Sequence, residues 1–86
     1  MQELDGLRKE IDALDTHLLE IIQKRLLMMK AIGEVKKTLG KSVKDEAREK
    51  QKMEIIEKQA NALHIPLQLV RKIWNIFFET AIEIEQ

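Results

Sequence analysis

Apolar side chains recur along the first part of the chain in alternating steps of three and four residues, the spacing of a heptad repeat. This spacing predicts one helix from about Glu3 to Leu39. Such a helix would extend about 55 Å, too long to fold back within a small globule, so we expect it to pair with a second copy of itself. The positions of this heptad face are Leu4, Leu7, Ile11, Leu14, Leu18, Ile21, Arg25, Met28, Ile32, Val35 and Leu39.

The remainder of the chain predicts two shorter helices. Gly40 supplies a helix stop, and a short polar connection follows it. A second helix is expected from about Asp45 to Asn61, with acidic residues in its first turn. Pro66 fits the first turn of a third helix over residues 66–85. The apolar face of this third helix consists of Leu69, Val70, Ile73, Trp74, Phe77, Phe78, Ala81 and Ile82.

Composition favours an all-α fold in a single domain over residues 1–86. Strand-forming residues are scarce, because Tyr is absent and Phe and Trp together number three. There is no cysteine, so neither a disulfide nor a thiolate metal site is available, which fits the reducing cytoplasm where we expect the protein. A chain this short needs added burial, and oligomerisation is the remaining source of it. We therefore expect a homodimer.

Charge balance excludes two classes of partner. Fifteen basic and fifteen acidic side chains cancel, so no overall field attracts nucleic acid or anionic lipid. No apolar run approaches the roughly 20 residues needed to span a bilayer. We expect neither a nucleic acid nor a membrane as partner.

Arg25 is the one cation on the heptad face, where its neighbours three and four residues away are Leu, Ile or Met. One interpretation is that its stem lies along the face while the charge reaches water, or that it sets the register of a coiled coil. The other is a buried cation that awaits an anion, because an unpaired buried guanidinium costs several kcal/mol. The pattern alone leaves both open.

Two further cations on the first helix could join Arg25 in a site. Lys36 follows it by eleven residues, close to three full turns, so both lie on one face about 16 Å apart along the axis. Arg8 precedes it by seventeen residues, about 25 Å, so it can share a small pocket only from a partner chain packed antiparallel. The alternative for Lys36 and Arg8 is ordinary solvated charge.

The two shorter helices also contain candidate site residues. Asp45, Arg48 and Glu49 stand one turn apart on one helix face, an arrangement also typical of a salt-bridged surface. Glu85 follows Ala81 by one turn at the end of an apolar face, where a frayed terminus is the alternative. The two histidines, at positions 17 and 64, are expected on the surface.

The order of these residues resembles the all-helical chorismate mutase family of the type II fold. The motifs are LR, IDALD, a mid-helix R, IGxxK and VxDxxRE, which contain Arg8, Arg25, Lys36, Asp45, Arg48 and Glu49 in sequence. The resemblance covers nearly the whole chain. It implies an intertwined antiparallel homodimer that rearranges chorismate to prephenate without cofactor or metal. Each active site would use three helices of one subunit and the leading arginine of the other.

The resemblance also implies roles for the individual residues. Arg8 of the partner subunit and Arg25 would clamp the two carboxylates of chorismate, with Arg48 as a supporting cation, because guanidiniums bind carboxylates bidentately. Asp45, through its backbone, and Glu49 would hold the ring hydroxyl. Lys36 would donate to the ether oxygen, on which negative charge grows as the C–O bond breaks.

Two positions depart from the commonest bacterial pattern of the family. Ala81 stands where a small hydroxyl residue is often found, so its hydrogen bond is lost. Glu85 stands where a glutamine usually donates to the ether oxygen, although fungal members also place a glutamate there. A carboxylate donates only when protonated, so we expect activity to favour acidic pH.

Two other functions remain compatible with the sequence. Isochorismate-pyruvate lyases share this fold and a similar cationic pocket. A non-enzymatic helical dimerisation module would explain the heptad face without any site. Substitution of Arg25 by leucine distinguishes the mutase from the module, because a mutase should lose turnover without this cation whereas a dimerisation module should not lose function.

Overall fold

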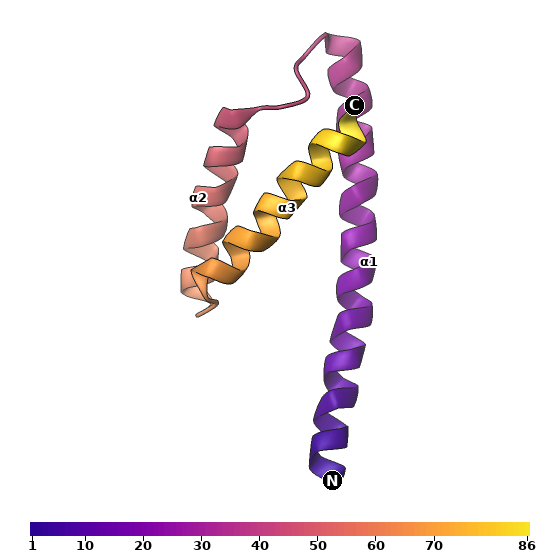
Figure 1. Cartoon of the computed structure of the whole chain (residues 1–86), viewed down its shortest axis with the longest axis vertical. Coiled ribbons are helices and arrows are strands. Elements are labelled where there is room, and N and C mark those ends of the chain that lie inside the picture. Colours follow the sequence, from indigo (N-terminus) through magenta and orange to yellow (C-terminus); the bar gives the residue numbers. More distant parts are fainter.

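The computed structural model describes all 86 residues, and they form three α-helices. α1 spans Gln2–Leu39, α2 spans Glu46–Ala62 and α3 spans Leu67–Glu85, and the chain contains no strand. The prediction of an all-α chain with three helices is confirmed. α1 runs the full length of the molecule, while α2 and α3 lie beside its C-terminal half (Figure 1). None of the three helices has the length and apolar content needed to cross a membrane.

The helix ends follow from local chemistry. Gly40 takes the left-handed conformation, with φ 67°, and lets the N–H groups of Gly40 and Lys41 donate to the carbonyls of Lys37 and Lys36 at 3.2 and 2.8 Å. At the start of α2 the side chain of Asp45 accepts a hydrogen bond from the Arg48 N–H at 3.0 Å. These two caps fix both ends of the connection from α1 to α2.

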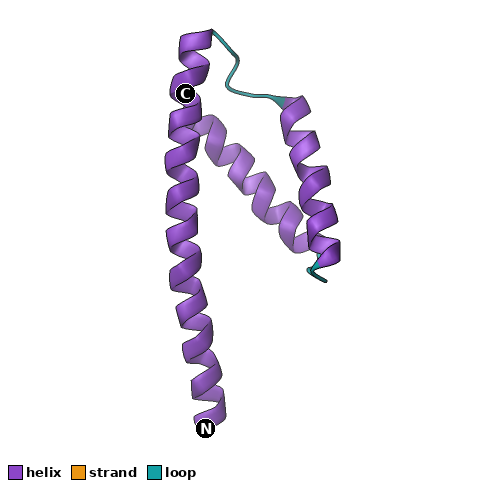
Figure 2. Ribbon diagram, turned by 180° about the vertical axis from the view of Figure 1, so that it is seen from behind, coloured by secondary structure: helices purple, strands orange, loops and turns teal.

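α3 makes the tertiary contacts that connect the three helices. It packs against both α1 and α2, whereas α1 and α2 do not pack against each other (Figure 2). Near the α2–α3 turn, Ile56, Ala60 and Val70 form a small core. At the other end of α3, Met29 and Gly33 are buried at the crossing with α1, together with Glu85. α3 is therefore anchored to α2 at one end and to α1 at the other.

The heptad face has no partner within its own chain. Each of its apolar residues is at least 42% exposed, and no residue before Ile22 is even partly buried. The radius of gyration is 16.4 Å, against about 12 Å for a compact domain of this length. Exposed apolar surface on this scale marks an interaction site.

Candidate active site

A cavity of about 320 Å³ lies between the three helices. That volume is within the range of small-molecule sites. Its lining combines apolar residues of α1 and α3 with charged residues from all three helices. Seven of the eight residues predicted for the site line it: Arg25, Lys36, Asp45, Arg48, Glu49, Ala81 and Glu85. The eighth, Arg8, is exposed on the first turns of α1 and does not line the cavity of its own chain.

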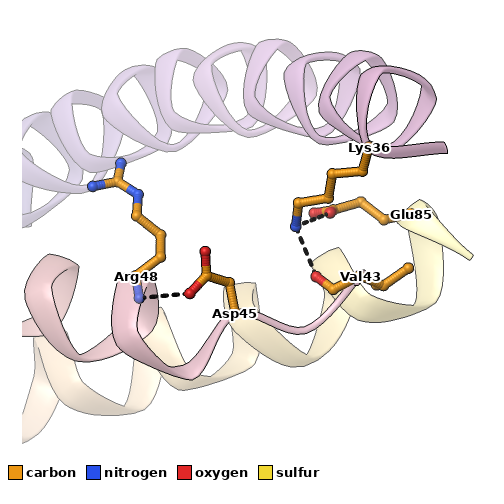
Figure 3. Close-up of polar contacts among 5 residues, drawn as sticks. All are labelled: Lys36, Val43, Asp45, Arg48 and Glu85. Atoms are coloured by element: carbon orange, nitrogen blue, oxygen red, sulfur yellow. Dashed lines mark hydrogen bonds and ion pairs between the residues drawn. The ribbon is translucent and has the colours of Figure 1, made fainter. Parts of the chain in front are cut away.

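Lys36 and Glu85 form an ion pair at one end of the cavity (Figure 3). The Lys36 Nζ donates to Glu85 Oε1 at 2.6 Å and to the carbonyl of Val43 at 2.7 Å. The Glu85 side chain is only 6% exposed, whereas that of Lys36 is 20% exposed. An ammonium has three donors, so one N–H of Lys36 remains available to a ligand. Oε2 of Glu85 makes no hydrogen bond to the protein.

Gly33 makes this ion pair possible. A Cβ at Gly33 would lie 2.8 Å from the Cα of Glu85, a distance that real Cβ atoms do not reach. The absence of a side chain therefore lets α3 approach α1 closely, three residues before Lys36 on the same side of the helix. The mid-helix glycine serves a close helix crossing that positions Glu85.

Substitution of Gly33 by alanine should displace the end of α3. Because the obstacle is backbone rather than a flexible side chain, we expect a loss of about 1–3 kcal/mol in the free energy of unfolding, measured by urea titration, together with reduced turnover. Gly6→Ala is the matched control, since nothing lies within 4 Å of a Cβ there. That exposed helical position should gain up to about 1 kcal/mol. Equal effects of the two substitutions would contradict the close-crossing explanation.

Arg25 points into the same cavity without an anionic partner. Its Cζ lies 4.2 Å from the centroid of the Phe77 ring, and partial burial lowers the pKa of the guanidinium from its ordinary value. No acidic side chain forms an ion pair with it, and no carbonyl accepts a hydrogen bond from it. The structure thus presents a half-buried cation whose donors are free.

The N-terminal end of α2 contributes three polar residues, the N-cap Asp45 and two residues of the first turn. The Asp45 carboxylate is engaged as the helix cap, and Arg48 extends from α2 towards α1 without forming an ion pair (Figure 3). Glu49 is 3.5 Å from the Nζ of Lys44. Asp45 and Arg48 are exposed, as the surface interpretation predicted, but no ion pair joins Asp45, Arg48 and Glu49 to one another.

Several lining residues give little or no signal in the sequence. Lys52 lines the cavity one turn after Arg48, and that spacing was the available signal. The Val43 carbonyl, which holds Lys36, left no signal because any residue carries a carbonyl. The periodicity predicts Phe77 and Phe78 on an apolar helix face, and both also line the cavity.

The arrangement suits a small anionic ligand. Four basic side chains, Arg25, Lys36, Arg48 and Lys52, surround the cavity with three acidic ones, Asp45, Glu49 and Glu85, and the remaining wall is apolar. Of the acidic residues, Glu85 and Asp45 are already engaged by Lys36 and by the helix cap. No three His, Cys, Asp or Glu side chains are grouped so as to hold a metal ion. The free donors can bind carboxylates and stabilise negative charge on oxygen.

Comparison with known proteins agrees with this chemistry. The sequence model of the family described as chorismate mutase type II matches residues 7–86. A protein named chorismate mutase from Methanocaldococcus jannaschii is 30% identical over 79 residues, which cover 92% of this chain and 80% of that protein. The T-protein of Enterobacter agglomerans is 35% identical over 71 residues, 83% of this chain but only 19% of the T-protein. No solved structure gives a significant match.

Proposed function

The chain belongs to the chorismate mutase type II family, and from this premise we propose that it rearranges chorismate to prephenate. The reaction is an intramolecular [3,3] shift in which one C–O bond breaks and one C–C bond forms, so no group leaves and no proton is transferred. Catalysis then consists of holding the reactive conformer and stabilising the charge that develops. The cavity offers cations and donors on a partly apolar wall, which suit both tasks.

The strongest support for this function is the Arg25 guanidinium, which is half-buried and has no anionic partner. A half-buried guanidinium with free donors is stabilised by an anion that binds it bidentately. Chorismate carries two carboxylates, and we assign one of them to Arg25, with Arg48 as a supporting cation. This assignment explains why a heptad face otherwise made of apolar residues includes an arginine.

Lys36 is assigned to the ether oxygen of the substrate. Its ammonium is held by Glu85 and the Val43 carbonyl, so the remaining N–H is oriented before the substrate binds. One preorganised donor to a developing oxyanion is typically worth about 3 kcal/mol. Glu49 and the backbone of Asp45 are assigned to the ring hydroxyl, which agrees with the Asp45 carboxylate being occupied as a helix cap. Ala81 supplies apolar wall only.

We further propose that the active form is an antiparallel homodimer in which Arg8 of the second subunit completes the site. Two features support it: the heptad face is exposed along the whole of α1, and the single-chain cavity lacks Arg8. Association of two heptad faces would bury this surface. Arg8 would then bind the second carboxylate of chorismate, which Arg25 alone leaves unbound.

The direct test is the loss of chorismate absorbance on addition of the purified protein without cofactor. We expect prephenate as the product. A parallel reaction with isochorismate, monitored for pyruvate and salicylate, tests the lyase alternative. Consumption of isochorismate without consumption of chorismate would contradict the proposed function.

The pH dependence of the rate tests Glu85. If its carboxyl must carry a proton on Oε2 to donate to the ether oxygen, turnover should fall as pH rises, because the ionised carboxylate has no proton to donate. In Glu85→Gln the amide donates at every pH, so its profile should remain flat over the same range. Identical neutral-to-alkaline profiles for the two proteins would exclude a protonated Glu85.

A further inference from the structure

We propose that Phe77 is a positioning residue that fixes the Arg25 guanidinium for carboxylate binding before the substrate arrives. The proposal deepens the function given above and rests on it for the identity of the ligand. The contact itself is a property of the ligand-free chain. The Cζ of Arg25 lies 4.2 Å from the centroid of the Phe77 ring.

The ring is the one specific partner of this cation. Arg25 forms no ion pair and no hydrogen bond with the rest of the chain. An arginine side chain has many rotamers, and an unrestrained one would have to be ordered by the substrate at the moment of binding. A cation–π contact strengthens when the cation is partly desolvated, as Arg25 is. The ring therefore removes part of that ordering cost in advance.

The position of the ring is in turn fixed by the core. Trp74 contacts Phe77 edge to face, with centroids 5.5 Å apart and an interplanar angle of 86°. Trp74 also packs against the cluster of Ile56, Ala60 and Val70 where α2 meets α3. A continuous series of aromatic contacts thus connects the core to the guanidinium.

An aromatic partner suits this task better than an acidic one. An aspartate or glutamate would occupy the N–H edge of the guanidinium, the same donors that a substrate carboxylate needs. The Phe77 ring contacts the cation through its π face and accepts none of those in-plane hydrogen bonds. Arg25 can therefore be held in place and remain free for the ligand.

Substitution of Phe77 by leucine removes the π face and retains an apolar side chain. We expect KM for chorismate to rise about five- to tenfold with kcat within about twofold, because the lost contact orders a group used in ground state and transition state alike. A merely destabilised fold would lower kcat per mole of protein and leave KM unchanged. Phe77→Tyr keeps an aromatic ring at this position and should therefore keep the wild-type KM.

An NMR measurement on the ligand-free protein tests the contact independently of activity. In the wild-type protein and in Phe77→Tyr, the ring current should shift the Arg25 Nε–Hε proton to lower frequency. The shift should be lost in Phe77→Leu and kept in Phe78→Leu, the same truncation at a neighbouring residue of the same cavity.

Each outcome decides the proposal. An unshifted Arg25 proton in the wild-type protein overturns it without any variant. Equal increases in KM for Phe77→Leu and Phe78→Leu, with the Arg25 signal unchanged, would make Phe77 an ordinary apolar wall and overturn it as well. A wild-type protein that shows the shifted proton but does not consume chorismate would instead refute the proposed function and leave the contact established.

Discussion

Replacement of Arg25 by leucine should abolish turnover and leave the helical fold as stable as before or more so. The wild-type guanidinium is half-buried without an anionic partner, so removing it relieves a desolvated charge in the free protein. In the substrate complex the same change leaves one carboxylate of chorismate without the guanidinium that binds it. We expect a loss of about 3–5 kcal/mol, on the order of a thousandfold in kcat/KM.

The matched control is Arg71→Leu. Arg71 lies on α3, where its Nε is 2.6 Å from Glu57 Oε1 and its side chain is 45% exposed. The same chemical change there should alter unfolding by no more than about 1 kcal/mol and leave turnover intact. Thermal unfolding and chorismate consumption of the two variants form the measurement. Full activity of Arg25→Leu would favour the non-enzymatic helical module over the mutase.

The fold class could be predicted because the signals that determine it are local. The three- and four-residue steps of the heptad face, the left-handed Gly40 and the Asp45 cap act within one or two helix turns. The long helix was predicted to need a partner, and the exposed heptad face agrees with that need. The dimer itself remains a prediction.

The site was only partly predictable because its contacts depend on how α3 crosses the other helices. Periodicity placed Phe77 on an apolar face but does not determine that this face also meets Arg25. A glycine in the middle of a long helix is compatible with a close helix crossing or with simple tolerance of the residue, and only the position of the Glu85 backbone beside Gly33 decides between them. Glu85 was identified by its place at the end of an apolar helix face and by its departure from the family pattern, yet its pairing with Lys36 spans 49 residues of sequence.

Mixing the Arg8→Ala and Arg25→Leu variants, each inactive by itself, should restore activity if Arg8 acts across the dimer. Arg8→Ala should lose about 2–5 kcal/mol of transition-state binding, comparable to Arg25→Leu. In a mixed dimer, the intact Arg25 of one subunit meets the intact Arg8 of the other at one site, while the second site carries both lesions. Random exchange at equal concentrations makes half of the dimers mixed, so about a quarter of wild-type activity should return.

The control for this experiment pairs Arg25→Leu with Lys36→Met. Both residues line the cavity of the same chain, so every site in that mixed dimer keeps one lesion and activity should stay absent. Rescue confined to the Arg8 pairing would show that the site is shared, because Arg8 lies outside the cavity of its own chain. A monomer by sedimentation, or an Arg8→Ala variant with full activity, would contradict the shared site. The exposed heptad face would then require another partner.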